Sequence, residues 1–145
     1  MSPPIPRYRI WLFLGSALGG LGVVLGAFAA HGLKSFLGIA NDEWLARQAN
    51  WETAARYQMY HAVALLAVGL LAARRCGLAI HLAGLTMTLG TLIFSGCLYA
   101  LVLSGQKWWG AVVPIGGSLM IVGWVCLAIA IARDGEQPAN TGRAD

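Results

Sequence analysis

Four stretches of this chain are apolar over about the length needed to cross a bilayer, and this constrains its fold more than any other feature. Backbone polar groups find no water in hydrocarbon, so a crossing segment must be a helix of roughly 20 residues. The composition agrees, since 58% of the residues are hydrophobic and 11% are charged, against about a quarter charged in soluble domains. The sequence predicts one membrane domain with helices at about residues 10–30, 53–73, 78–103 and 111–132 and tails at 1–9 and 133–145.

The connections between these stretches predict how the helices are arranged. Two are short turns, at residues 74–77 and 104–108, and one is longer, at residues 31–52. Short turns join antiparallel neighbours, so the chain is expected to form an all-α, integral-membrane, up-down four-helix bundle.

The longer connection holds signals for a helix of its own. Asn41 or Asp42 can cap a helix whose first turn contains Glu43. A straight helix from Asp42 to Ala73 would be about 48 Å long and would overshoot the hydrocarbon. Either the helix projects outward or, as we expect, it bends near Asn50, so that its first part is a short interfacial helix on the membrane surface with its tryptophans toward the lipid.

Basic residues indicate the orientation, because short cytoplasmic loops carry an excess of lysine and arginine. On the side of both termini lie Arg7, Arg9, Arg74, Arg75, Arg133 and Arg143. On the other side lie Lys34, Arg47, Arg56 and Lys107. We therefore expect both termini in the cytoplasm. Attraction to the anionic inner leaflet then explains the net charge of +4, and no nucleic-acid partner is implied.

The first helix has some features of a cleaved signal peptide. Arg7 and Arg9 precede its apolar run, and Ala27-Phe28-Ala29 fits the small-x-small rule before a cleavage site. The run from Ile10 to Ala30 has 21 residues, whereas the apolar region of a signal peptide has roughly 7–15. We expect this helix to remain as a membrane anchor.

Small residues recur at helical spacing and indicate close helix–helix packing. The candidates are Gly15, Gly19, Gly22 and Gly26 in the first helix, Gly84, Thr88 and Thr91 in the third, and Gly116 and Gly117 in the fourth. Pro114 is expected to start the fourth helix, with the two glycines after it allowing close approach. A backbone anion site at that helix start is the alternative.

Polar and ionisable residues gather toward the outer ends of the predicted helices, as a binding site would require. They are His31, Glu52, Arg56, Tyr57, Tyr60, His61, Ser95 and Tyr99. The spacing of Glu52 and Arg56 favours a helical ion pair. Because twelve uncharged residues follow His61, it is expected below the interface, with His31 as its nearest candidate partner. The structural alternative is an interfacial belt of aromatic residues with surface charge pairs.

No motif in the sequence points to a particular chemistry. It contains no strong metal-ligand spacing, phosphate loop or nucleophile elbow, and Cys76, Cys97 and Cys126 suggest neither a disulfide framework nor a zinc site. We expect no cofactor. The favoured function is an accessory or structural protein that packs onto a larger membrane assembly or binds lipid. The alternatives are a small-solute or proton conductor lined by the outer polar residues, and a metal-binding protein or enzyme using His31, His61 and either Cys97 or Met59.

Several motifs, in order, resemble those of a known family. They are G-A-F-x-A-H at residues 26–31, E-T-A-x-x-Y-x-x-x-H at 52–61, L-x-F-S-G-x-L-Y at 92–99, P-x-G-G at 114–117 and G-W at 123–124. Over about residues 10–132 the chain is similar to the YgdD/YwdK-type family of small bacterial membrane proteins, which has a human mitochondrial relative. The resemblance implies a multi-pass, four-helix inner-membrane protein with no established activity.

The chain departs from that family's pattern at three positions. Ala29 stands where the family usually has glycine, Cys97 where it has serine and Val113 where it has threonine. Each departure makes the outer end less polar or less open. A ligand held through the serine and threonine hydroxyls of the family would therefore lose two contacts here.

Overall fold

The computed structural model describes residues 7–75 and 77–133, and within these ranges it is almost entirely helical. The elements are α1 (Arg7–His31), α2 (Leu33–Leu37), α3 (Asn41–Arg74), α4 (Leu78–Ser104) and α5 (Trp109–Arg133). The all-α prediction is confirmed for these residues. Cys76, Arg143 and the tails at 1–6 and 134–145 lie outside the described residues.

Three of the described helices are long and apolar enough to cross a membrane. They are α1 from Tyr8 to His31, α4 from Leu78 to Ser104 and α5 from Trp109 to Arg133. Helix α3 is not among them although it is longer, because the half that begins at Asn41 carries many polar and charged side chains. The structure therefore supports a multi-pass membrane protein with three candidate spans.

The connection after α1 differs from the interfacial helix that the sequence predicts. Helix α3 begins at Asn41 and runs unbroken through Asn50 to Arg74, 34 residues in all, or about 51 Å. Its tryptophans do not face away from the protein. Trp51 is buried against Phe28 and Tyr99, and its indole N–H donates to the Leu25 carbonyl at 2.9 Å. Burial of this side keeps the polar start of α3 against the other helices.

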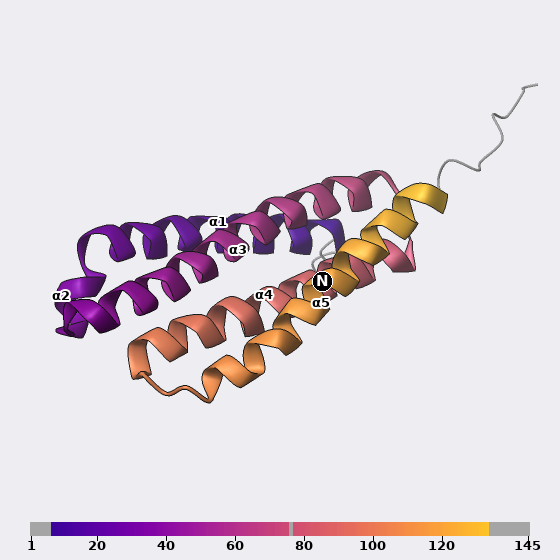
Figure 1. Ribbon diagram of the computed structural model, residues 1–145. Helices are drawn as coiled ribbons and strands as arrows, with labels where there is room; N and C mark the ends of the chain where they lie inside the picture. The colour runs from indigo at the N-terminus through magenta and orange to yellow at the C-terminus, as the bar shows by residue number, and fades with distance from the viewer. Residues whose placement is uncertain (1–6, 76, 134–145) are drawn as a thin grey trace, which may run out of the picture.

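The long helices pack mainly against their neighbours in chain order. Helix α1 lies along α3, α3 along α4, and α4 along α5, as Figure 1 shows. The end of α1, the start of α3 and the α4–α5 turn lie toward one end of the molecule, and the end of α5 lies toward the other. Arg74 and Arg133 therefore lie toward the same end, away from α2.

Two glycines end helices in a conformation that other residues adopt at a cost. Gly38 follows α2 with φ of 60° and donates its N–H to the Lys34 carbonyl, and Gly105 follows α4 with φ of 71° and donates to Leu101. Left-handed glycines of this kind are a common way to satisfy the last carbonyls of a helix. They explain why α2 is short and why α4 stops where its apolar run ends.

The glycine stripe of α1 faces α3, but the two helices diverge along it. A Cβ added at Gly15 would lie 2.8 Å from the Ala62 carbonyl oxygen, whereas at Gly22 its nearest neighbour would be the Met59 methyl at 3.4 Å. At Gly26 it would meet nothing within 4 Å. Gly26, which the spacing groups with the packed glycines, therefore borders open space.

Helices α4 and α5 approach most closely where two glycines meet. A Cβ on Gly90 would lie 2.8 Å from the Gly116 carbonyl oxygen. A Cβ on Gly116 would lie 2.8 Å from the Gly90 carbonyl oxygen and 2.5 Å from the Phe94 backbone nitrogen. Backbone therefore touches backbone at this crossing. Pro114 lies inside α5 and does not start it, so Gly116 and Gly117 are not at a helix N-terminus as the sequence suggested.

The remaining small residues of α4 serve packing and internal bonding. Gly84 leaves room for the Trp11 indole, since a Cβ there would lie 2.6 Å from the ring. Thr88 and Thr91 return their hydroxyl hydrogens to carbonyls one turn back in α4, at 2.7 Å each. Threonines that bond in this way bring no unsatisfied polar group into the interface.

The described core has two parts. The larger joins α1, α3, α4 and α5 around residues such as Leu65, Val68 and Met87, none of which is exposed. The smaller lies at the α2 end, where Leu33 and Trp51 pack with Val102. Helix α2 therefore covers the end of the α1–α3–α4 interface and separates it from solvent.

Candidate functional site

The eight polar residues singled out by the sequence do not form one cluster. They divide among a cavity between α1 and α3 (Glu52, Arg56), a groove between α3 and α5 (Tyr57, Tyr60, His61), the α1–α3–α4 interface (Ser95, Tyr99) and the exposed end of α1 (His31). Each place presents different chemistry, so each is described separately.

His61 is buried and both of its ring nitrogens are engaged. Nδ1 lies 2.8 Å from the Tyr57 carbonyl oxygen, and Nε2 lies 3.3 Å from the indole nitrogen of Trp124 on α5. A carbonyl can only accept and an indole N–H can only donate, so Nδ1 carries the proton and Nε2 accepts. The ring is a neutral imidazole that joins α3 to α5.

The expected contact between His31 and His61 is not present. His61 precedes Ala62, which packs against Gly15 and Gly19 of α1, whereas His31 is twelve residues beyond Gly19, or about 18 Å along the helix. Within the residues that the structure describes, no group of three or more histidine, cysteine or acidic side chains could hold a metal ion. His31 and His61 thus face different surroundings.

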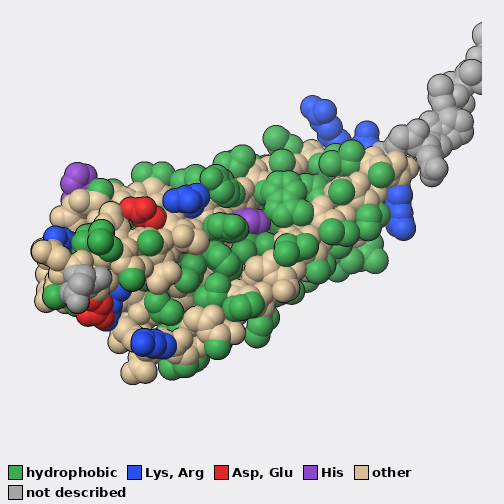
Figure 2. Space-filling model, in the orientation of Figure 1, with side chains coloured by type: hydrophobic (Ala, Val, Ile, Leu, Met, Phe, Trp, Pro, Cys, Tyr) green, Lys and Arg blue, Asp and Glu red, His purple; other side chains and the backbone are tan. Residues whose placement is uncertain are grey.

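The groove between α3 and α5 has a volume of about 500 Å³ and is mostly apolar. Its walls are Tyr57, Tyr60 and Val63 of α3 and Trp124 of α5, with His61 between them. Figure 2 shows hydrophobic side chains over this face and one histidine among them. In a bilayer such a surface suits hydrocarbon, because it is mostly apolar and the nitrogens of His61 and Trp124 are already bonded within the protein.

A buried amide, Gln58, links three helices and was not among the residues that the sequence singled out. Its Nε2 donates to the Leu18 carbonyl of α1 at 2.8 Å, and its Oε1 accepts from the Tyr99 hydroxyl of α4 at 3.0 Å. Ser95 of α4 donates to the Ala54 carbonyl of α3 at 2.8 Å. Gln58 could have been found from its spacing to Ala54 and Ala62, which puts it on the core face of α3.

In the described residues α3 forms an ion pair between Glu43 and Arg47, earlier on the helix than the predicted pair. Arg47 donates to Glu43 at 2.6 Å and to the Val102 carbonyl near the end of α4 at 2.8 Å. Glu52 instead accepts from Gln48 at 2.9 Å. The predicted ion pair of Glu52 with Arg56 is not formed in the described residues.

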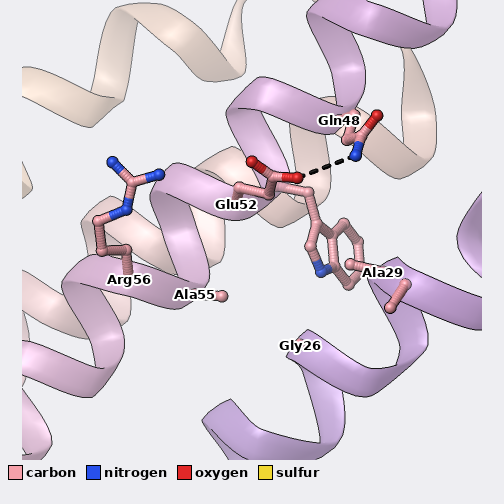
Figure 3. A pocket seen from close by; sticks show the side chains of 8 residues that line it. Gly26, Ala29, Gln48, Glu52, Ala55 and Arg56 are labelled. Atoms are coloured by element: carbon pink, nitrogen blue, oxygen red, sulfur yellow. Dashed lines mark hydrogen bonds between the residues drawn. The ribbon is translucent and has the colours of Figure 1, made fainter.

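The cavity between α1 and α3 lies where these helices diverge, and its volume is about 310 Å³. Helix α1 contributes Gly26, Ala29 and Ala30, which are small and uncharged. Helix α3 contributes Trp51 and Ala55, together with the polar side chains of Gln48, Glu52 and Arg56. Figure 3 shows Glu52 and Arg56 projecting from the same side of α3, with Glu52 bonded to Gln48. One wall is thus apolar and the other carries both charges.

Comparison with known proteins identifies relatives across most of the chain. The family described as "Protein of unknown function (DUF423)" matches residues 25–117. A UPF0382 membrane protein of Staphylococcus aureus is 40% identical over 122 residues, which is 84% of this chain and 94% of the relative. A UPF0382 membrane protein of Staphylococcus epidermidis is 38% identical over 125 residues, which is 86% of this chain and 97% of the relative.

A more distant relative carries the name that the motifs had suggested. The UPF0382 inner membrane protein YgdD of Escherichia coli K12 is 32% identical over 125 residues, 86% of this chain and 91% of the relative. No solved structure gives a significant match. The family match begins near Gly26 and ends near Gly117, so it includes both the cavity beside α1 and the Gly90–Gly116 crossing.

Proposed function

The chain belongs to the UPF0382 (DUF423) family of membrane proteins of unknown function, and from this premise we propose that it is a bacterial inner-membrane accessory protein that packs against other membrane subunits. In this proposal it has no catalytic role of its own, and lipid covers whatever surface its partners leave. The resemblance to a protein named for the inner membrane supports this location.

One observation carries the proposal: each buried polar side chain in the described residues already has a partner inside the molecule. Gln58, His61 and Ser95 bond between helices or to their own backbone, and Thr88 and Thr91 bond within α4. A catalytic or relay group would need an atom left for a substrate. Here these atoms fix helix positions, as expected of polar residues in a structural bundle.

The apolar outer surfaces of α1 and α5 provide the faces for partners. Much of each helix is exposed in the isolated chain, and large side chains project from both. Among the most exposed are Phe13, Val23 and Val24 on α1 and Ile115, Ile121, Val125 and Ile131 on α5. Lipid or a neighbouring subunit must cover such surfaces, because water contact with them is unfavourable.

We further propose that α3 also crosses the membrane, so that four helices form an up-down bundle with both termini in the cytoplasm. Helix α3 lies along both α1 and α4, which are candidate spans. Figure 2 shows basic side chains toward both ends of this face and acidic ones only toward the α2 end. Arg74 and Arg133 at the opposite end favour the cytoplasmic side by the positive-inside rule.

The competing functions have weaker support. A conductor would need its polar groups to line one path, but Glu52 and His61 face different cavities. A metal site using His31 and His61 would need both rings within bonding distance of one ion, about 2 Å from each nitrogen. The exposed end of α1 and the buried Trp124–His61 pair do not favour this.

Photocrosslinking in intact membranes tests the accessory role. A benzophenone amino acid is placed at Phe13 and Val24 on α1 and at Ile121 and Val125 on α5, with Val68, which is not exposed, as the matched buried control. We expect at least one outer face to yield a discrete protein adduct that the control lacks. The adduct is identified by mass spectrometry and verified by a reciprocal tag on the captured subunit. Adducts with lipid alone at all four positions would refute a subunit role.

A flux assay separates the conductor from the accessory protein. Purified full-length chain is reconstituted in vesicles with a pH-sensitive dye, beside His61→Ala and Glu52→Gln variants. We expect no flux above that of protein-free vesicles. Flux that the parent supports and either variant abolishes would overturn the proposal in favour of conduction.

A further inference from the structure

We propose that the cavity between α1 and α3 binds the headgroup of a zwitterionic phospholipid with a primary amine, phosphatidylethanolamine. In this assignment the Arg56 guanidinium contacts the lipid phosphate and the Glu52 carboxylate contacts its ammonium group. The site does not depend on the accessory role, since lipid binding requires no protein partner.

The position of the cavity along α1 matches the level of lipid headgroups. Gly26, Ala29 and Ala30 belong to the last turns of the candidate span that ends at His31. Residues at the end of a span lie at the boundary between hydrocarbon and headgroups. On α3, Tyr60 is one turn from Arg56 toward the membrane centre and is 57% exposed, and tyrosine is enriched at that boundary.

The two charges at the cavity are available to a ligand. Arg56 makes no hydrogen bond or ion pair within the described part of the chain. Glu52 bonds only Gln48, through one carboxylate oxygen, which leaves the second oxygen able to accept. Two opposite charges one turn apart would ordinarily pair with each other. Here they remain separate and both border the same cavity, so each can serve a different group of one ligand.

The charge pattern selects the kind of headgroup. A guanidinium binds phosphate oxygens through two parallel N–H donors, and a carboxylate accepts from an ammonium N–H. Residues four apart on a helix have Cβ atoms about 5–6 Å apart, a span comparable to the two-carbon bridge between phosphate and amine. A choline group has no N–H to donate to Glu52. A headgroup with phosphate as its only charge would meet Arg56 but would also be repelled by Glu52.

The dimensions of the cavity suit a headgroup and leave the acyl chains outside. A volume of about 310 Å³ is at the lower end of ligand pockets. Val23 lies on the α1 face of Gly26 and Ala30, toward the membrane centre, and is 63% exposed. It offers an apolar surface for the chains. Since a Cβ at Gly26 would meet no atom within 4 Å, the cavity wall has space that a larger side chain could fill.

Native mass spectrometry of the full-length chain tests this assignment. The protein is released from mixed micelles that contain equal amounts of phosphatidylethanolamine, phosphatidylcholine and phosphatidylglycerol with identical acyl chains. We expect the parent protein to retain the ethanolamine lipid in preference to the other two. Glu52→Gln should abolish the preference for ethanolamine over choline and increase glycerol-lipid retention. Arg56→Gln should reduce retention of the ethanolamine lipid about tenfold, because it removes a charge-assisted phosphate contact.

A steric pair of variants distinguishes this cavity from general lipid contact. Gly26→Leu should block retention, whereas Gly20→Leu, at another α1 glycine with no atom within 4 Å of its added Cβ, should leave it unchanged. Circular dichroism and thermal unfolding verify that each variant is folded. Equal retention of the three lipids by the parent, or equal effects of the two leucine variants, would overturn the proposal.

Discussion

Trp124 and His61 are 63 positions apart in the chain, yet the indole N–H of one donates to Nε2 of the other at 3.3 Å. A second pair repeats this chemistry nearer the other end, where Trp11 of α1 donates to Nδ1 of His81 on α4 at 3.2 Å. Neither pair joins helices that are packed along most of their length. The two indole–imidazole bonds therefore tie α3 to α5 and α1 to α4, across the main sequence of contacts.

Removing the indole donor should weaken the link between α3 and α5. Trp124→Phe keeps an aromatic ring but leaves His61 Nε2 without its donor, so we expect the free energy of unfolding to fall by about 0.6 kcal/mol, the average for such bonds in membranes. The measurement is equilibrium unfolding in mixed micelles. Trp108→Phe, in an exposed turn, serves as the control. If the cost of Trp124→Phe persists in a His61→Leu background, the bond is not its cause.

Adding one methyl group at the α4–α5 crossing should separate these helices. In Gly116→Ala the new Cβ would lie 2.5 Å from a backbone nitrogen of α4, so both helices must move, and we expect a loss of about 1–3 kcal/mol in unfolding free energy.

The matched change on α4 should have the opposite sign. Gly96→Ala adds a Cβ that meets nothing within 4 Å, and replacing a helical glycine by alanine stabilises by about 0.5–1 kcal/mol. Thermal unfolding of the two variants beside the parent gives both values. Equal effects of the two changes would mean that the close crossing does not exist in the membrane.

The bond between Tyr99 and Gln58 should be visible as coupling. Tyr99→Phe leaves the buried Gln58 Oε1 without its donor, and we expect a cost of about 1–2 kcal/mol. Gln58→Leu leaves the tyrosine hydroxyl without its acceptor. The double variant removes both unsatisfied groups, so its cost should be smaller than the sum of the two. Additive losses across the four proteins would argue against a direct bond.

The proposed orientation predicts opposite labelling at the two ends of α5. In a cysteine-free background, Lys107→Cys should react with a membrane-impermeant maleimide in cells whose outer barrier is opened. Arg133→Cys should react only after the inner membrane is permeabilised. Both side chains are exposed in the structure, so failure to label reflects location and not burial. The reverse pattern would place the termini outside the cytoplasm.

The sequence was sufficient to locate the apolar helices. The prediction of residues 78–103 is within one residue of α4, and that of 111–132 is within two residues of α5 at each end. A segment that crosses hydrocarbon must be a helix without interruption, and turn-forming residues such as Gly105 follow directly after these segments. Local chemistry thus determines these bounds.

The sequence was insufficient wherever a choice depended on contacts between distant segments. The spacing predicts a pair of Glu52 with Arg56, one turn after it, whereas in the structure Glu52 bonds Gln48, one turn before it. The expected interfacial helix before Asn50 is instead the start of α3, and Trp51, the next residue, is held by Leu25 and Phe28 of α1. The partner of His61 depends on how α5 is rotated and placed beside α3, which no local spacing encodes.

The order in which the long helices touch has a consequence for biosynthesis. Since α1 lies on α3, α3 on α4 and α4 on α5, each of α3, α4 and α5 is synthesised after a long helix against which it packs. The main packing contacts between the long helices can therefore form in chain order, as each helix is inserted. The two tryptophan–histidine bonds join helices outside this order, so they form only after the later helix of each pair has been inserted, and the α3–α5 bond marks the arrival of the last described helix.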